Sequence, residues 1–571
     1  MLNRKLWNIA PRISPEAMQK LEPFSPLAAQ LLHNRGITDI PAAKAFLAWD
    51  ESLLEDPLLL PDMGSAISRL QGALADSETI GIFGDFDADG ITGTALLAEG
   101  LENLGGKVIP YLPHRVTEGH GLSSQAVHAL HEQGVTLIVT VDCGITSPVE
   151  VAEAASLGID TIITDHHTPL PEIPAALAIV NPKLAGSVYP FRDLAGVGLA
   201  FKLVQGLSNH MGKQWDERLL QLAALGTVTD VTPLVGENRY IVAAGLRSMT
   251  ADPKPGLKEL LRLGGKADST LDTESISFVI GPRLNAPGRL EHAISSYNLL
   301  RAASQEKAAP IAKELDRMNK ERRDLTEKAL DNATAQMESS LEGQVPMSEH
   351  ILLLWSEEFT SGIVGLLASK LVDEHYLPAV VVALDGNIGR GSARSIPEFN
   401  LASALEECQD LFIRFGGHPR AAGFIISREN LPDLHERLTT IARRELAHLS
   451  IKPTINIDAH VRLTSLSGAN SQFFQDLSPY GEGNPTPVFI TKGVKVVNVT
   501  RLGSQGKHLR FRLKHGGALW DGMAFGQGEA WQDGTDILDV VYSVGRNQWN
   551  GQDTMRIIIH DFRPADGPSR A

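Results

Sequence analysis

Three aspartates, Asp85, Asp87 and Asp89, alternate with other residues in the segment 84–90 (GDFDADG). An apolar run that predicts a strand at 80–83 precedes the segment, and a helical pattern follows at 91–104. Side chains of an extended backbone alternate between two sides, so the spacing predicts three carboxylates on one face. Carboxylates this close repel one another unless a cation lies among them. Because Mg²⁺ and Mn²⁺ select oxygen-rich sites, the segment is interpreted as half of a metal site.

Two other interpretations of this segment have to be weighed. A calcium-binding EF-hand loop also opens with this pattern, but it needs a bidentate Glu at its twelfth position, where this chain has Leu96. The apolar strand before the segment also contradicts a helix–loop–helix. A solvated acidic turn is the other alternative, and it is common for one Asp-Gly pair but less so for three alternating aspartates.

More acidic and histidine side chains follow other strands of the same region. Alternating strands and helices predict an α/β domain with a mostly parallel sheet and right-handed crossovers. Ligands of such sheets collect at the carboxyl ends of the strands, where Asp142 and the run Asp165, His166, His167 lie. We therefore expect these residues to converge on the acidic segment. The expected strands are 80–83, 108–112, 136–141, 159–163 and 177–180.

The converging residues suit a site for two metal ions. A carboxylate at a central strand end, here Asp142, can bridge two ions, and a small-residue segment at 222–230 ends in a further carboxylate, Asp230. Two ions about 3.5–4 Å apart stabilise the attacking and leaving oxygens of phosphoryl displacement. The histidine favours Mn²⁺ over Mg²⁺. The candidate ligands are Asp85, Asp87, Asp89, Asp142, His166 and Asp230.

Length and composition predict an ordinary soluble protein of several domains. The 571 residues are 43% hydrophobic, and no apolar run approaches the roughly 20 residues that span a bilayer. The N-terminus starts with basic residues but no apolar signal core follows. Cys143 and Cys408 lie in different predicted domains and suggest no disulfide framework, so a reducing cytoplasm and no membrane are expected.

The net charge of −16 argues against a protein that coats nucleic acid nonspecifically, but it does not exclude a nucleic-acid enzyme. Basic residues are concentrated at 491–517, a stretch without Asp or Glu. Alternation near the end of the chain predicts a small β-barrel. Phe511 alternates with Arg510 and Arg512, which is typical of a strand with one charged face. The alternative is a barrel with basic edge strands whose core includes Phe511.

The pattern along the chain predicts five parts. A helical N-terminal segment precedes the α/β unit, and a helix at 311–335 connects that unit to a second one. A loop at 343–349 suggests a boundary, and the chain becomes β-rich from 455. The expected parts are an N-terminal segment (1–78), a catalytic domain (79–300), a connecting helix (301–342), a second α/β domain (343–450) and a C-terminal barrel (451–571).

These motifs resemble a known superfamily. The segments 84–90, 142–145, 165–167 and 226–230 are similar, in order, to four motifs of DHH phosphoesterases. The segments 391–395 and 416–418 resemble the associated DHHA1 domain. Three further segments, 115–122, 281–289 and 479–485, resemble the branch of RecJ-type single-strand-specific exonucleases. The resemblance runs from about residue 25 to near the end of the chain.

The resemblance implies 5′-to-3′ degradation of single-stranded DNA to 5′ mononucleotides, in DNA repair and recombination, with two Mn²⁺ or Mg²⁺ ions. It gives Asp85, Asp87 and Asp142 to one ion, and Asp89, Asp142, His166 and Asp230 to the other. His167 would contact the scissile phosphate, and Asp165 would orient a histidine. The presence of Asp85, where small-molecule relatives often have His, favours the exonuclease branch.

The resemblance also implies a site for the 5′ phosphate. Arginine suits phosphate because its planar fork is bidentate and always charged. Arg115, Arg289, Ser392 and Arg394 match positions that grip phosphate in the family. His418 and the amides around 416–417 could add an anion nest, the alternative being a tight turn. Arg283 can equally be a structural ion-pair residue, and the barrel would be an OB-fold that binds single strands through Arg510 and Arg512.

The sequence departs from the family pattern at one place, and two alternative functions remain. Phe359 and Thr360 stand where the family commonly has a Trp-His pair, so a histidine contact to nucleic acid or to the catalytic face is expected to be absent. The rival enzyme is a phosphodiesterase of short oligonucleotides or cyclic dinucleotides, which a chain ending after the DHHA1 unit would favour. The rival of another class is an inactive scaffold that binds nucleic acid. A single-strand-binding protein and a helicase are implied as partners by resemblance only.

Overall fold

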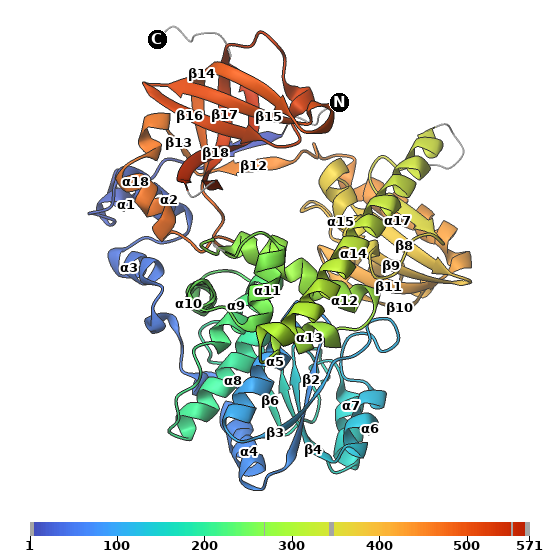
Figure 1. Cartoon of the computed structure of the whole chain (residues 1–571). Coiled ribbons are helices and arrows are strands. Elements are labelled where there is room, and N and C mark those ends of the chain that lie inside the picture. Colours follow the sequence, from blue (N-terminus) through green and yellow to red (C-terminus); the bar gives the residue numbers. More distant parts are fainter. Residues whose placement is uncertain (1–4, 268, 342–347, 550–551, 566–571) are drawn as a thin grey trace.

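The computed structural model describes residues 5–267, 269–341, 348–549 and 552–565. The first domain is built on a five-stranded sheet with the order β3-β2-β4-β5-β6 (Figure 1). All four neighbouring pairs are parallel, which confirms the predicted sheet. The carboxyl ends of its strands therefore meet at one edge. The strands are β2 (Thr79–Gly84), β3 (Lys107–Tyr111), β4 (Val135–Val141), β5 (Asp160–Thr164) and β6 (Ala178–Val180).

Helices cover both faces of this sheet. On one face α4 (Met63–Ala75), α5 (Ala88–Asn103) and α8 (Gly196–His210) bury the apolar side chains of β2 and β4. On the other face lie α6 (Ser124–Glu132) and α7 (Pro148–Ser156). The side chain of Ser123 caps α6, and Pro148 occupies the first turn of α7, where its missing N–H costs nothing.

A helical layer follows the sheet and leads to the connecting helix α14 (Gln305–Leu341), which is longer than the predicted 311–335. The first half of α14 packs on the first domain, and its second half shares an apolar cluster with the second domain. Residues 342–347 of the predicted boundary loop lie outside the described residues. The helices of the layer are α9 (Leu219–Thr229), α10 (Gly236–Ala251), α11 (Pro255–Leu263), the π-helix η3 (Ser275–Ile280), α12 (Gly281–Leu290) and α13 (Ile294–Leu300).

The second domain has a five-stranded sheet with the order β10-β11-β9-β8-β7. Only the pair β7–β8 is parallel. One face packs against α14 and α15 (Val364–His375), the other against α16 (Leu401–Glu406) and α17 (Leu431–Leu446). The strands are β7 (Leu352–Ser356), β8 (Ala379–Asp385), β9 (Ile388–Arg394), β10 (Phe412–His418) and β11 (Ala421–Ser427).

The expected anion nest or tight turn at 416–417 is wrong. Gly416 and Gly417 lie inside β10 and pair with Gly423 and Ala422 of β11. A nest needs a curled backbone whose amides point to one spot, whereas this ladder holds the backbone extended.

The C-terminal part is a closed five-stranded barrel. β14 pairs with both β15 and β17, and β16 pairs with β18, so the sheet has no open ends. Phe511 is wholly buried in its core, as the alternative interpretation held, while Arg510 and Arg512 point outward. The strands are β14 (Val488–Leu502), β15 (His508–His515), β16 (Ala518–Ala524), β17 (Ile537–Trp549) and β18 (Gln552–Pro564), and β13 (Ala459–His460) pairs with β14.

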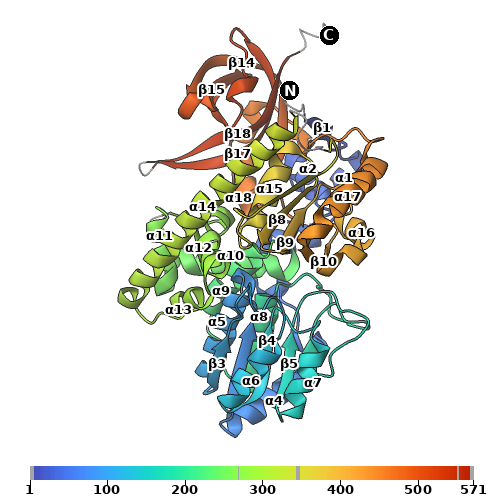
Figure 2. The same cartoon turned by 90° about the vertical axis from the view of Figure 1, so that its right-hand side faces the viewer.

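The N-terminal segment packs in two places. β1 (Leu6–Ile9) pairs with β12 (Thr454–Ile457), and α1 (Pro15–Gln19), α2 (Pro26–Asn34) and α3 (Ile40–Ala48) join the apolar cluster of the barrel. In contrast, α4 belongs to the core of the first domain. Figure 2 shows β1 near the barrel, far from the first sheet. The stretch predicted as one helical unit is therefore shared between two distant cores.

A single arginine ties these parts together. Arg239 of α10 is fully buried, and its guanidinium donates hydrogen bonds to the carbonyl oxygens of Phe46, Leu477 and Ser478.

In the described part of the chain, no helix has the length and apolar character needed to cross a bilayer.

Candidate metal centre

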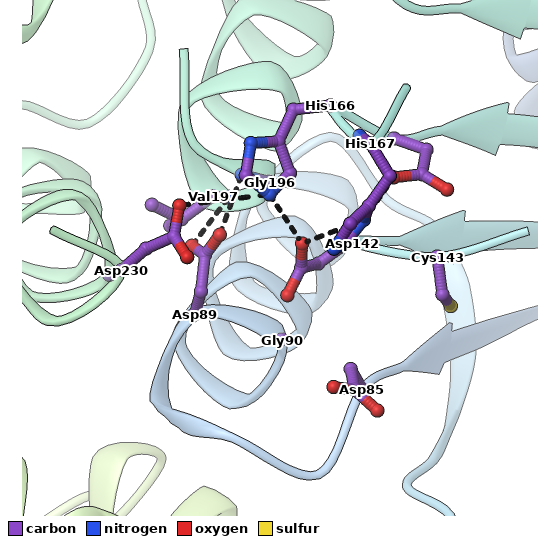
Figure 3. A network of polar contacts seen from close by, with 12 residues as sticks. Asp85, Asp89, Gly90, Asp142, Cys143, His166, His167, Gly196, Val197 and Asp230 are labelled. Carbon is purple, nitrogen blue, oxygen red and sulfur yellow. Dashed lines mark hydrogen bonds and ion pairs between the residues drawn. The ribbon is translucent and has the colours of Figure 1, made fainter. Parts of the chain in front are cut away.

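The predicted residues meet at the carboxyl edge of the first sheet (Figure 3). Asp142 directly follows β4, His166 follows β5, and Asp230 ends α9. His166 Nε2 lies 3.1 Å from Asp142 Oδ1 and 3.7 Å from Asp230 Oδ2. Residues far apart in the sequence are thus within ligand distance of one point, because parallel strands end together.

Three groups of side chains have ligand atoms that all lie within 4.8 Å of one another. One group is Asp85, Asp87 and Asp142, and another is Asp89, His166 and Asp230. The first group is the set that the resemblance gives to one ion. The second group lacks Asp142 from the set given to the other ion, but Asp142 Oδ1 lies 3.1 Å from His166 Nε2 of that group. The third group joins Asp142 to His166 and His167. The geometry brings all six predicted ligands together, and their assignment to two ions stays a prediction.

The expected route by which the three aspartates converge is wrong. β2 ends at Gly84, and the chain turns directly into α5, so Asp85, Asp87 and Asp89 do not alternate along an extended backbone. Asp87 is the N-cap of α5, and its side chain accepts hydrogen bonds from the amides of Asp89 and Gly90. α5 therefore begins at Ala88, three residues before the expected start at 91, and Asp87 stabilises that start as its cap.

The backbone at Asp142 is strained. Its φ of 62° lies in the left-handed region, which non-glycine residues seldom adopt. Gly196, at the start of α8, lies so close that a Cβ added to it would be 2.4 Å from Asp142 Cβ. Strained conformations of this kind persist where the surroundings over-determine them, and they cluster at functional sites. α8 therefore helps to hold the Asp142 carboxylate in place.

Neighbouring backbone groups position the other carboxylates. Amides of Gly196 and Val197 donate to the two oxygens of Asp89, at 2.7 and 2.9 Å. Asp165 accepts hydrogen bonds from the Ile145 amide and from His167 Nδ1, at 3.0 and 2.8 Å. Burial opposes ionisation of Asp165, but its hydrogen bonds with His167 and Ile145 outweigh burial and lower its pKa. Asp165 thus stays a carboxylate that can orient His167.

Burial and mutual repulsion oppose ionisation of the carboxylates in this site. Burial raises the pKa of Asp142 well above its usual range, and the Asp89 and Asp87 carboxylates raise it further. Burial and Asp87 raise the pKa of Asp89 to about 7, and burial and Asp89 raise that of Asp230 to about 9. Burial, with the neighbouring His167, lowers the pKa of His166 to about 3, so the ring is neutral and able to bind metal.

One buried oxygen shows directly that the residues fit a cation. Asp85 Oδ1 is buried and accepts no hydrogen bond from any described residue. An unpaired buried carboxylate oxygen is costly. A divalent ion between Asp85, Asp87 and Asp142 would pair that oxygen, and the all-oxygen set suits Mg²⁺ or Mn²⁺.

These pKa shifts predict a pH-dependent stability. Raised folded-state pKa values at Asp89 and Asp230 stabilise the metal-free fold at low pH, and this stabilisation is lost as pH rises through about 7 and then about 9. The melting temperature of EDTA-treated protein should therefore fall between about pH 6 and about pH 8.5. The gain in melting temperature on adding Mg²⁺ should grow over the same range, because fewer protons compete. The variant Asp230→Asn should flatten both trends, and a Mg²⁺ effect independent of pH would contradict the assignment.

Beside the metal centre lies a cluster of arginines. Arg115 lies over the Phe86 ring, 4.8 Å from its centroid, and the Asp85 and Asp87 carboxylates oppose the lowering of its pKa by burial. Burial and, to a smaller extent, nearby Arg115 together lower the pKa of Arg289 to about 9. Burial and Arg115 also lower the pKa of Arg394. Three arginines gathered next to a metal centre have the charge and geometry that suit an anion such as phosphate.

Two residues of this region were not predicted. Arg322 of α14 lies near enough to Arg289 to lower its pKa, and its buried Nε has no hydrogen-bond partner among the described residues. His120 Nδ1 lies 3.2 Å from Asp85 Oδ2, and its ring contacts that of His167. Nothing in the helical pattern around Arg322 distinguishes it from other surface arginines. His120 did belong to a recognised motif, 115–122, and its position there was the available signal.

The other predicted residues lie at different distances from this centre. Ser392 Oγ accepts a hydrogen bond from Arg394 at 3.1 Å, and His418 lies across β11 from Arg394. Arg510 and Arg512 lie on the barrel, well away from the first sheet (Figure 1). Arg283 pairs with Asp316, which confirms its structural alternative.

The departure at 359–360 has a packing explanation. Phe359 is buried in the apolar cluster between α14, α15 and the second sheet. Shortly after it, the Gly362 carbonyl accepts a hydrogen bond from Arg289 Nη1 at 3.3 Å. The segment therefore packs the second domain against α12.

Comparison with known proteins places this arrangement in a family. The family model described as the DHH family, N-terminal domain, matches residues 79–227, the DHHA1 domain matches 348–444 and the RecJ OB domain matches 457–561. The single-stranded-DNA-specific exonuclease RecJ of Bacillus subtilis (strain 168) is 37% identical over 543 residues, covering 94% of this chain and 68% of that protein. The protein of the same name from Escherichia coli (strain K12) is 32% identical over 94% of this chain and 96% of its own length.

A solved structure agrees with the sequence relatives. The crystal structure of RecJ in complex with Mn²⁺ from Thermus thermophilus superimposes with a TM-score of 0.84 at 30% identity, covering 99% of this chain and 80% of that one. A second crystal structure of that protein, with Mg²⁺, matches with a TM-score of 0.79. The fold, the metal-ligand geometry and these relatives agree that the chain belongs to the RecJ family of single-stranded-DNA-specific exonucleases.

Proposed function

We propose that the protein degrades single-stranded DNA from the 5′ end and releases 5′ mononucleotides by two-metal hydrolysis with Mn²⁺ or Mg²⁺. The observation that carries this proposal is the position of Asp142 between Asp85 and Asp87 on one side and His166 on the other. A shared carboxylate between two ligand sets is the arrangement that two neighbouring ions require.

Each side chain has a role in this scheme. Asp85, Asp87, Asp89, Asp142, His166 and Asp230 hold the metal ions. Two such ions, when bound, stabilise the attacking and leaving oxygens of the displacement and help water to lose a proton.

The second domain and its neighbours position the DNA end. Arg115, Arg289, Ser392 and Arg394 bind the 5′ phosphate, which places the next phosphodiester at the metal centre. Asp165 accepts the Nδ1 proton of His167, so the Nε2 of that ring is free to contact the scissile phosphate. The domains 79–300 and 343–450 thus each supply part of one site, and the barrel at 451–571 binds the strand through Arg510 and Arg512.

The setting of the reaction is also proposed. The two cysteines, Cys143 and Cys408, are free and buried, as suits a cytoplasmic protein. A role in DNA repair and recombination follows from the substrate, and a single-strand-binding protein and a helicase are the partners that would expose it.

The rival phosphodiesterase of short oligonucleotides or cyclic dinucleotides is not favoured. A closed barrel follows the second domain and matches the RecJ OB domain, and such barrels bind extended single strands. The inactive scaffold is not favoured either, because all six expected metal ligands are present and gathered.

Mononucleotide release from labelled DNA tests the proposal. With Mn²⁺, 5′-phosphorylated linear single strands should be degraded, while circular single strands and blunt duplex should be spared, and EDTA should stop the reaction. A dinucleotide cleaved in preference to long strands would establish the rival phosphodiesterase. Binding without cleavage would establish the scaffold.

A further inference from the structure

One face of the second sheet carries an ordered set of residues that the metal centre does not use. The pairing register of β9, β11 and β10 aligns their side chains in three rows across the strands. Residues directly opposite one another in a ladder point to the same face. The rows are His418, Ala421 and Arg394; Gly416, Gly423 and Ser392; and Arg414, Ile425 and Arg390. We call this face the arginine trough.

The trough is an uncovered part of the sheet. On β11 the residues Ala422, Phe424 and Ile426 are buried on the opposite face, whereas Gly423 is exposed between the half-buried Ala421 and Ile425. α15 packs on β8 and β9, where Gly365 lies close to Ser392 and Arg394, so the uncovered part of the trough is the part formed by β11 and β10. The trough floor therefore consists of small or apolar residues, with basic side chains on the strands at either side.

The floor glycines leave space that nothing in the described structure fills. A Cβ added at Gly416 would meet no atom within 4 Å, and one at Gly423 would meet only the Gly391 carbonyl oxygen, at 3.8 Å. Neither glycine has a positive φ. Glycine within a strand weakens it and often marks a place where a ligand approaches the backbone closely. Neither the packing nor the backbone conformation requires glycine at these two positions. What the two glycines contribute is the free space above the sheet, which a ligand can occupy.

The charges of the trough are uncompensated. The side chains of Arg390 and Arg414 make no hydrogen bond or ion pair with any residue that the structure describes. Two arginines of α17 in the same domain, Arg437 and Arg444, pair instead with Asp410 and Glu407. Arg390 and Arg414 lie at the two ends of one row on the same face of the sheet, so together they suit an anion that the chain itself does not supply.

The trough is continuous with the proposed phosphate site. Arg394 belongs both to its first row and to the arginine cluster, where Arg115 lowers its pKa. In Figures 1 and 2, β10 lies at the side of its sheet nearest the first domain. The third row lies four residues along β9 from the first, about 13 Å at the usual rise of a strand.

We propose that the arginine trough binds the sugar–phosphate backbone of single-stranded DNA, with Arg390 and Arg414 holding a second phosphate about 13 Å from the one at Arg394. The glycines at the centre of the floor allow a sugar to lie against the sheet. The flanking strands are about 10 Å apart, so the trough accommodates one strand. This inference rests on the proposed function and adds a contact for the substrate.

Charge removal tests the third row. The full chain, in EDTA to prevent cleavage, is titrated with a 5′-phosphorylated oligothymidylate of about 12 nucleotides at several salt concentrations. In the double variant Arg390→Gln, Arg414→Gln, we expect Kd to rise by about tenfold or more and the slope of log Kd against log salt to fall by about 1.4. The control is Arg437→Gln, Arg444→Gln, which removes the same charge from paired arginines and should bind like wild type.

Filling the floor tests the trough independently of charge. The variant Gly423→Val places a branched side chain where a backbone would lie, and it should melt at or above the wild-type temperature because valine favours a strand. Its Kd for the same oligothymidylate should nevertheless rise. Equal binding by Gly423→Val and wild type would overturn the proposal.

The remaining outcomes separate this inference from the proposed function. If the arginine double variant had the affinity and salt slope of wild type, the proposal that the trough binds DNA would be wrong. The proposed function would be unaffected as long as the wild-type chain released mononucleotides. Weaker binding of thymidine 5′-monophosphate without weaker binding of the oligothymidylate would also overturn it, since the row would then bind a free nucleotide. Failure of the wild-type chain to release mononucleotides would instead remove the proposed function.

Discussion

Replacing Asp142 with alanine is expected to lower the rate of mononucleotide release by about 10³-fold or more while single-strand binding survives. The side chain lies between the two ligand sets, so its loss weakens both metal positions at once. Charge stabilisation by metal ions amounts to several kcal/mol of the barrier, and each 1.36 kcal/mol is about tenfold in rate. Release of labelled mononucleotide and anisotropy with single-stranded DNA measure the two properties separately.

A matched variant separates charge from backbone strain. Alanine at position 142 has to adopt the left-handed φ of 62°, which costs on the order of 1 kcal/mol or more, whereas asparagine tolerates it. Asp142→Asn should therefore fold like wild type and still lose activity. Wild-type turnover in either variant would exclude Asp142 from the metal centre.

The substitution Gly90→Ala should disable the centre without touching a ligand. A Cβ at Gly90 would lie 2.5 Å from both the amide nitrogen and the carbonyl oxygen of Asp85. These are backbone atoms that no rotamer change can move, so the turn between β2 and α5 must shift and carry Asp85 and Asp87 with it. Overpacking costs about 1–3 kcal/mol of stability, and a 1 Å misplacement can cost about 10²-fold in rate. Thermal melting and Mn²⁺-dependent mononucleotide release measure the two effects.

The control is another helical glycine. A Cβ at Gly72 of α4 would meet no atom within 4 Å, so Gly72→Ala should stabilise the protein by about 0.5–1 kcal/mol and leave activity unchanged. If Gly90→Ala behaved like this control, the close approach of α5 to the Asp85 backbone would not constrain the site.

The convergence of the metal ligands was predictable because it follows from topology. Once alternating strands and helices indicate a parallel sheet, Asp142 and His166 must lie at the same edge. The details within that edge were not predictable from the pattern. Asp87 caps α5 instead of extending a strand, because its side chain competes for the helix amides. The left-handed backbone at Asp142 depends on α8, a helix that begins far along the chain at Gly196.

Features set by pairing between distant segments had no local signal. The register that aligns Ser392, Gly423 and Gly416 depends on how three strands meet, and each strand alone shows only alternation. Likewise, the helical pattern of α2 indicates an apolar face but not that its partner is the barrel core. Arg322 was missed for the same reason, since only the packing of α14 brings it near Arg289.

The pairing of β1 with β12 also governs when the chain can finish folding. During synthesis the N-terminal helices emerge first, yet the barrel that buries Leu31 and Leu32 is made last. The first domain can assemble around α4, but the apolar face of α2 stays exposed until the barrel has formed. A chain that stops after the second domain leaves that face without a partner permanently, and exposed apolar surface of this kind promotes aggregation. Synthesis of the last strands therefore protects the first helices of the same molecule.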